Sequence, residues 1–338
     1  MYLIKMHGLL FISLMFLLPL SSCSDQSIQE EEVIIGEDSD YPLEGTLTLP
    51  SAHQEPIPAV VLVHGSGPSD RDQSVYSYTI FKDLAQALTT QGIAVLRYDK
   101  RTYTYQDSFT EEDLLTFTVY EETIEDAVRA IEHLLNDSRI DNEKIFLIGH
   151  SQGGMLAPRI YDISENLAGL IIMAGSPRPL WEIIYDQNLD VLEDLDPDSA
   201  LYETNHQQII KEYEKAQQLA DLTLEESMHE TIFGLPGYYL KEMESFDTEE
   251  VLREQSMPLL ILQGEKDFQV SVEKDFEAYQ ALLTDYDHAH FILYPDLNHF
   301  FINYQGEGKG TIEEYHQGGH VEDIVIDDIV NWINQTSN

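Results

Sequence analysis

Short runs of apolar residues alternate with amphipathic segments along most of this chain. The runs have the length of buried strands, and they comprise residues 59–63, 93–96, 144–148, 169–173, 258–262 and 291–294. Residues 81–90, 123–135 and 321–333 instead place apolar side chains three and four positions apart, which is the spacing of a helix with one buried face. Strands that are apolar throughout and alternate with such helices predict an α/β fold, in which a mostly parallel central sheet is flanked by helices.

Two further strands are predicted at residues 33–35 and 43–49, so we expect a core made of residues 33–177 and 258–338. Residues 178–257 have a different character, because they contain no convincing strand, several acidic amphipathic stretches and a Gly-Leu-Pro-Gly break at 234–237. They predict a helical cap insertion between two strands of the core. A long disordered loop is the alternative, but aromatic residues stay frequent there and disordered segments are poor in them.

The N-terminus has the pattern of a secretory signal peptide. Residues 1–22 contain Lys5 and then an apolar run at 8–20, which is shorter than the roughly 20 residues that span a bilayer. Leu-Ser-Ser-Cys at 20–23 resembles the lipobox of bacterial lipoproteins, which implies cleavage before Cys23 and a diacylglycerol on its sulfur. The polar, acidic residues 23–32 are expected to form a tether. We therefore expect an extracytoplasmic protein that is anchored to a bacterial membrane through the lipid on Cys23.

Composition narrows the possible functions. The chain has 18 Lys and Arg against 62 Asp and Glu, a formal net charge of −44, and so large a negative charge excludes nucleic acid as a partner. Its self-repulsion suggests a working environment of high salt or high pH. A single cysteine excludes a disulfide framework and a cysteine-ligated zinc site. No phosphate-binding loop, dinucleotide fingerprint or His-Glu-x-x-His motif is present, so we expect neither a cofactor nor a metal.

The strongest chemical signal is Gly-His-Ser-Gln-Gly-Gly at 149–154, which lies between a predicted strand and a predicted helix. This is the context of a nucleophile elbow, with Ser151 as the nucleophile. Gly149 and Gly153 would be required because the backbone is crowded two residues on either side of the serine. The alternative is a glycine-rich turn with a passive serine. His150 is expected either to line the pocket or to be structural.

A second loop, His64-Gly65-Ser66-Gly67, directly follows the strand predicted at 59–63. In enzymes with a nucleophile elbow, such a loop provides one backbone N–H of the oxyanion hole, and the residue after the nucleophile provides the other. The donors here would be the N–H groups of Ser66 and Gln152. A tight turn that caps the strand is the alternative for this loop. Asp70, Arg71 and Asp72 could hold it in place through ion pairs with Arg97 or Lys100.

Five motifs in this order resemble the α/β-hydrolase superfamily, and they are most similar to its bacterial esterases and serine-aminopeptidase-like members. They are HGSGPSDRD at 64–72, RYDKR at 97–101, GHSQGGM at 149–155, GEKD at 264–267 and NHF at 298–300. The resemblance spans residues 33–335 apart from the insertion, and it implies a Ser–His–Asp hydrolase with a cap. One departure is Arg-Thr-Tyr-Thr-Tyr at 101–105, where relatives usually carry a glycine-rich turn, so the path of residues 101–106 is open.

The other two triad members follow from the order nucleophile, acid, base. Asp267 follows the strand at 258–262 and is the expected acid, with Glu265 as its rival. His299 follows the strand at 291–294 and is the expected base, whereas its rivals at 316 and 320 lack a preceding strand.

Three functions are consistent with this pattern. The first is hydrolysis of small carboxylic esters through an acyl-enzyme, and the second is hydrolysis of amides or peptides by the same triad. An acidic group in the pocket that captures a free amine would favour the second. The third is a binding lipoprotein whose triad is vestigial. A Ser151→Ala variant would separate it from the other two.

Overall fold

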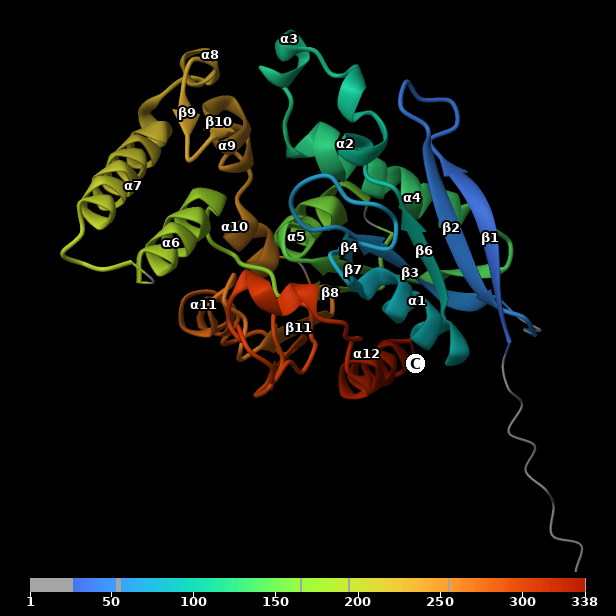
Figure 1. Cartoon of the computed structure of the whole chain (residues 1–338). Helices are drawn as coiled ribbons and strands as arrows, with labels where there is room; N and C mark the ends of the chain where they lie inside the picture. Colours follow the sequence, from blue (N-terminus) through green and yellow to red (C-terminus); the bar gives the residue numbers. More distant parts are fainter. Residues whose placement is uncertain (1–26, 53–55, 165, 194, 255, 338) are drawn as a thin grey trace, which may run out of the picture.

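The computed structural model describes residues 27–52, 56–164, 166–193, 195–254 and 256–337, and its centre is an eight-stranded sheet (Figure 1). The strand order is β1-β2-β6-β3-β7-β8-β11-β12, and all neighbours from β6 to β12 are parallel, whereas β2 runs antiparallel to β1 and β6. The strands are β1 (Ile28–Ile35), β2 (Leu43–Pro50), β3 (Ile57–Val63), β6 (Ala94–Tyr98), β7 (Ile140–His150), β8 (Gly169–Met173), β11 (Leu259–Gly264) and β12 (Ala289–Tyr294). The predicted α/β fold with a mostly parallel sheet is confirmed.

Helices cover both faces of the sheet because successive side chains of each buried strand point to opposite faces. Val60 and Leu62 of β3 belong to the apolar cluster under α1 (Ile80–Thr90) and α12 (Asp323–Thr336). Val61 and Val63 belong to the cluster under α4 (Glu125–Leu135), α5 (Gln152–Ser164) and α11 (Glu277–Leu282). Strands buried on both faces need apolar residues at every position, which is the pattern that the sequence carries.

The edge strand β1 corrects one prediction. It begins at Ile28, so residues 28–32 belong to the sheet, and the expectation of a tether is wrong for them. Their acidic side chains are paired with arginines from distant segments, through Glu30 with Arg97, Glu31 with Arg139 and Glu32 with Arg71. These pairs neutralise a segment that looks unable to pack when the sequence is considered alone. Residues 1–26, with the predicted signal peptide and Cys23, lie outside the described residues.

The segment after Lys100, whose path the sequence left open, is helical. It forms α2 (Arg101–Thr104) and leads into α4 through three short helices, which are the 3-10 helix Gln106–Ser108, α3 (Glu111–Leu114) and the π-helical turn Tyr120–Ile124. The buried guanidinium of Arg101 donates two hydrogen bonds to the carboxylate of Asp126, at 3.0 and 2.6 Å. This bidentate pair fixes the segment to α4 without the turn that relatives use.

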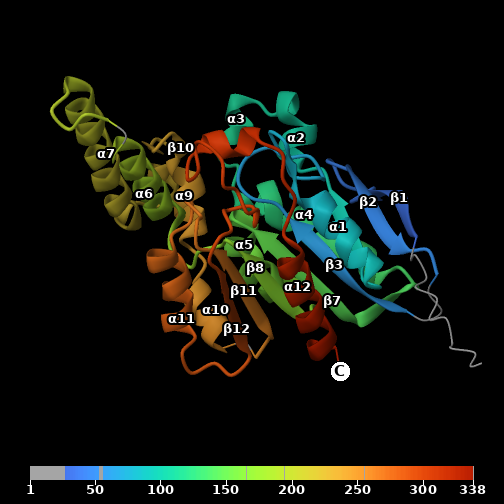
Figure 2. The ribbon, with the colours of Figure 1, turned by 60° about the horizontal axis from the view of Figure 1, so that its bottom comes forward.

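Residues 178–257 form the helices α6 (Leu180–Glu193), α7 (Ala200–Gln218), α8 (Leu224–Ser227), α9 (Gly237–Met243) and α10 (Thr248–Glu254). The sequence did not predict the short hairpin of β9 (Thr231–Ile232) and β10 (Leu235–Pro236), whose two loop residues, Phe233 and Gly234, have positive φ. In Figures 1 and 2 most of these cap helices stand beside the core, on the side away from β1 and β2. Among the described residues, no helix is long and apolar enough to cross a membrane.

Candidate active site

Ser151 lies at the sharp turn between β7, which ends at His150, and α5, which begins at Gln152. Its φ is +55°, a conformation that is rare for residues other than glycine. The backbone on both sides holds it there, since the Ser151 N–H donates to the Met173 carbonyl at 2.8 Å and the Ser151 carbonyl accepts from the Met155 N–H at 3.0 Å. A strained residue that is held in this way is a common feature of active sites.

The two glycines of the motif are required by close backbone contacts. A Cβ on Gly153 would lie 2.6 Å from the carbonyl oxygen of His64, and a Cβ on Gly149 would lie 2.6 Å from the backbone nitrogen of Gly154. Neither approach leaves room for a carbon atom, and backbone cannot move aside as a flexible side chain can. The elbow therefore depends on both glycines, as expected from the sequence.

Asp267 and His299 lie together on the loops that follow β11 and β12. The Nδ1–H of His299 donates to Oδ2 of Asp267 at 2.8 Å, which leaves Nε2 of the ring as the acceptor. The side chain of Asp267 has no exposed surface. Its Oδ1 accepts from the backbone N–H groups of Gln269 and Val270 at 2.8 and 3.0 Å, and its Oδ2 also accepts from the Gln263 side chain at 2.9 Å. The carboxylate is thereby fixed in one orientation.

The rival residues lie elsewhere. Glu265 is exposed in the turn and pairs with Lys266, as expected for a turn residue. His316 is exposed and packs against the ring of Tyr76, and His320 pairs with Asp83 of α1 at 3.1 Å.

His150 connects the serine turn to the loop of His299. The sequence left it as a pocket or a structural residue, and the structure buries it completely between these two loops. Its Nε2–H donates to the backbone carbonyl of His299 at 2.9 Å, and its Nδ1 accepts from the side-chain amide of Gln73 at 2.6 Å. Burial, together with the neighbouring His299, lowers the pKa of His150 well below the usual range, so the ring is neutral.

The loop after β3 packs against the serine turn. A Cβ on Gly65 would lie 3.3 Å from the Cβ of Ser151. Gly67 has a φ of +80°, which is a backbone conformation that favours glycine. The Nε2–H of His64 donates to the carbonyl of Asp70 at 3.0 Å. Burial, aided by the positive charge of Lys100, lowers the pKa of His64 to about 3, so this ring is also neutral.

Ion pairs hold the continuation of this loop. Asp72 accepts a hydrogen bond from Arg97 at 2.9 Å, which is one of the ion pairs expected from the sequence. Arg71 instead pairs with Asp99 at 2.8 Å and also reaches β1 and β2. Lys100 contacts none of these acidic residues, and its partner is Glu122.

A cavity of about 540 Å³ opens beside Ser151 and is lined by both the core and the cap. Ser66, Gly67, Ser151 and Gln152 contribute the polar side nearest the serine. The apolar lining consists mainly of Leu114, Phe117, Leu180, Ile183, Ile184, Phe233 and Leu235. Because Gln152 is the first residue of α5, its N–H has no partner within the helix and is available to a ligand.

One acidic side chain lines this cavity among the described residues, and sequence reasoning missed it. Glu122 is buried, and it is bound by Lys100 at 2.7 Å and by the hydroxyl of Tyr239 from the cap. Lys100 stood in a motif that the sequence analysis singled out, but nothing in the sequence pointed to Glu122 or Tyr239 as its neighbours. A π-helical turn at 120–124 presents Glu122 to the cavity.

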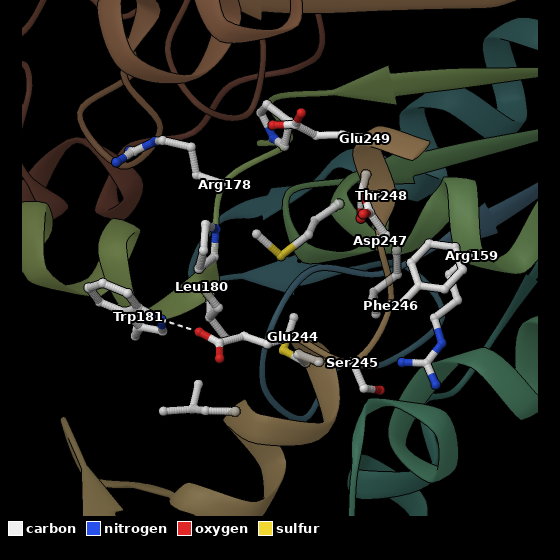
Figure 3. A pocket seen from close by; sticks show the side chains of 16 residues that line it. Arg159, Arg178, Leu180, Trp181, Glu244, Ser245, Phe246, Asp247, Thr248 and Glu249 are labelled. Carbon is white, nitrogen blue, oxygen red and sulfur yellow. Dashed lines mark hydrogen bonds between the residues drawn. The ribbon is translucent and has the colours of Figure 1, made fainter. Parts of the chain in front are cut away.

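A second cavity, of about 510 Å³, lies between α5 and the cap (Figure 3). Met155 and Leu180 line both cavities. Its polar groups already have partners, since Trp181 donates to Glu244 and Arg159 pairs with Glu242. None of the predicted triad or oxyanion-hole residues lines it. Across the described parts of the chain, no three His, Cys, Asp or Glu side chains are grouped so as to hold a metal ion.

Comparisons with known proteins agree with this geometry. The model of the alpha/beta hydrolase family matches residues 60–308. Esterase EstD of Thermotoga maritima is 35% identical over 308 residues, which cover 91% of this chain and 68% of EstD. Two solved structures share the fold at low identity. Est1E from Butyrivibrio proteoclasticus has a TM-score of 0.55 at 17% identity and covers 90% of this chain and 98% of its own. The Pyrococcus furiosus esterase Pf2001 has a TM-score of 0.56 at 16% identity, and the match covers 98% of this chain and 100% of Pf2001.

Proposed function

Since the chain belongs to the alpha/beta hydrolase family, we propose that it is a serine carboxylesterase with Ser151, His299 and Asp267 as its catalytic triad. The observation that carries the proposal is the hydrogen-bonded pair of Asp267 and His299 on loops next to the serine turn. The similarity to esterase EstD supports ester hydrolysis as the reaction.

In this mechanism the Nε2 of His299 accepts the proton of Ser151 while the serine oxygen attacks the ester carbonyl carbon. Asp267 holds the Nδ1–H and stabilises the imidazolium that forms. The N–H groups of Ser66 and Gln152 donate to the oxyanion. His299 then protonates the leaving alkoxide, and water releases the acid from the acyl-enzyme by the reverse proton transfers.

Esters are favoured over peptides with a free N-terminus. An aminopeptidase needs an unpaired carboxylate near the serine to bind the substrate ammonium. Glu122 already balances the charge of Lys100 and accepts from Tyr239. The apolar lining of the cavity favours an apolar acyl or alcohol group in the substrate.

The test is hydrolysis of p-nitrophenyl butyrate by the full chain and by its Ser151→Ala variant. Ser108→Ala, which changes an exposed serine, is the matched control. We expect turnover by the wild type and the control and at least a 10³-fold loss in Ser151→Ala. Labelling of Ser151 by a fluorophosphonate would identify the covalent step. A wild type that binds but does not hydrolyse esters would favour the binding lipoprotein instead.

We further propose that the protein is extracytoplasmic and tethered to a membrane through a lipid on Cys23. The lipobox-like sequence at 20–23 supports this proposal. Metabolic labelling with a radioactive fatty acid should mark the wild type and not a Cys23→Ser variant, which should leave the membrane fraction. Equal labelling of both would contradict the proposal.

A further inference from the structure

We propose that Lys100 is a positioning residue of the oxyanion hole, whose ammonium holds and polarises the peptide group between Gly65 and Ser66. The inference rests on the proposed esterase function, because it gives the N–H of that peptide group a role in the reaction.

Lys100 is buried directly after β6, and its side chain is 2% exposed. Its Nζ donates to the carbonyl oxygen of Gly65 at 2.9 Å and to Oε1 of Glu122 at 2.7 Å. The Gly65 carbonyl and the Ser66 N–H belong to one amide group. A positively charged donor beside the carbonyl oxygen draws electron density from the amide nitrogen towards the oxygen, so the Ser66 N–H becomes a stronger donor.

Stability alone does not account for this ion pair. Two buried charges pay a desolvation cost that their attraction about balances, and apolar residues of similar size stabilise a fold equally well or better. The pair instead forms a fixed dipole, because the ammonium of Lys100 lies against the Gly65 carbonyl and the carboxylate of Glu122 lies on its other side. A fixed dipole of this kind, shielded from water, orients the Gly65–Ser66 peptide group so that its N–H stabilises a developing negative charge without reorganisation during the reaction.

A chain of hydrogen bonds extends from this pair to the side chain of Gln152, the residue whose backbone N–H is the second proposed oxyanion donor. The hydroxyl of Tyr239 donates to Oε2 of Glu122, and its oxygen accepts from the side-chain amide of Gln152 at 2.7 Å. Burial and the neighbouring Glu122 raise the pKa of Tyr239 well above its usual range, so the hydroxyl keeps its proton. Lys100 and Tyr239 thus connect the residues of both donors.

Tyr239 lies on α9 of the cap. One step of the chain therefore depends on the cap being in place, and the cap contacts the side chains of Gln152 and Glu122 as well as lining the substrate cavity. The cap would thereby influence turnover as well as substrate selection.

The main test is the double variant Lys100→Met, Glu122→Gln, which removes both charges and keeps an acceptor for Tyr239. We expect kcat for p-nitrophenyl butyrate to fall about 10- to 100-fold, which is less than the loss of a whole oxyanion donor, with KM changed less than about threefold. The dissociation constant of n-butylboronic acid, which forms a tetrahedral adduct with the serine, should rise by the same factor as kcat falls. A merely structural role would not change kcat and the dissociation constant of the boronic acid by the same factor.

Lys82→Met, which removes an exposed lysine of α1, is the matched control and should change neither quantity. Tyr239→Phe removes the hydroxyl that binds Glu122 and Gln152, and it should lower kcat and boronate affinity together by about 3- to 10-fold, because a hydrogen bond contributes roughly that much. If the double variant does not fold, Lys100→Gln combined with Glu122→Gln, which keeps a donor at position 100 without either charge, provides the same comparison.

An unchanged kcat in a folded Lys100 variant, or a loss that appears in KM alone, would overturn the proposal. Absence of hydrolysis by the wild type would instead refute the proposed esterase function. The two failures are therefore distinguishable.

Discussion

Mild acid should destabilise this protein through its buried neutral histidines. His64 donates to the carbonyl of Asp70 and packs its ring against Phe81, with 4.9 Å between the ring centroids. Its pKa in the folded protein is about 3, and its ordinary value in an unfolded chain is 6.5. Between these values the unfolded chain binds a proton that the folded protein does not. Stability is therefore present above pH 6.5 and is lost as the pH falls.

The size of the loss follows from the two pKa values. For His64 alone, the free energy of unfolding should fall by about 2 kcal/mol between pH 8 and pH 5, and by about 4 kcal/mol between pH 8 and pH 3. His150, whose pKa is also lowered by burial, adds a loss of the same sign. Protonation of the carboxylates is common to the wild type and to a variant that lacks His64, so the difference between the two proteins isolates the contribution of His64.

Urea unfolding at pH 8 and pH 5, in constant molar salt, measures this loss. A His64→Gln variant keeps an amide that can donate to Asp70 and removes the titrating group. Its free energy of unfolding should be lower than that of the wild type at pH 8, because ring packing is lost. Its decrease from pH 8 to pH 5 should be smaller by about 2 kcal/mol. His290→Gln, which changes an exposed residue of β12, should keep the wild-type decrease. Equal decreases in the wild type and His64→Gln would refute the reasoning.

Three other outcomes are expected. Asp267→Asn should lower kcat for p-nitrophenyl butyrate by about 10³- to 10⁴-fold with little change in melting temperature, because the base loses its productive tautomer; a loss below tenfold would argue against this acid. Gly153→Ala should prevent folding to the native state, as read by circular dichroism, whereas Gly92→Ala, which meets nothing within 4 Å but has a φ of +91°, should cost only about 1 kcal/mol. The melting temperature should rise from 0.05 to 1 M NaCl by about 2–4 °C for each kcal/mol gained, since salt screens the net charge of −44; a flat curve would count against adaptation to salt.

The parts of the fold that were predictable are those in which each residue's environment is set by its near neighbours. Strands such as β8 and β11 are buried on both faces, so their apolar runs mark them without knowledge of their partners. The predicted site residues could be identified from the sequence for a related reason. Ser151, Asp267 and His299 each directly follow or lie near the end of a parallel strand, and ends of parallel strands meet at one edge of a sheet.

The first part of strand β1 was not predictable in the same way, although residues 33–35 were. Residues 28–32 are acidic and carry too few apolar side chains to indicate burial. They join the sheet because Arg71, Arg97 and Arg139 lie opposite them, and those arginines come from three separate segments of the chain. The charge of each residue was visible in the sequence, but the pairing that allows the strand to form was not.

The same reasoning explains why the surroundings of the catalytic residues were missed, although the residues themselves were found. A hydrophobic side chain is stabilised by any apolar neighbour, so its pattern alone predicts its burial. A buried charge or hydroxyl is stable only with one specific partner at hydrogen-bond distance, and that partner can come from anywhere in the chain. Glu122 lies 22 residues from Lys100 and 117 from Tyr239, and His150 binds a carbonyl 149 residues away. If these polar contacts tune the reaction, substitutions at Lys100 and Tyr239 should change turnover more than they change stability, while substitutions in the apolar core should do the reverse.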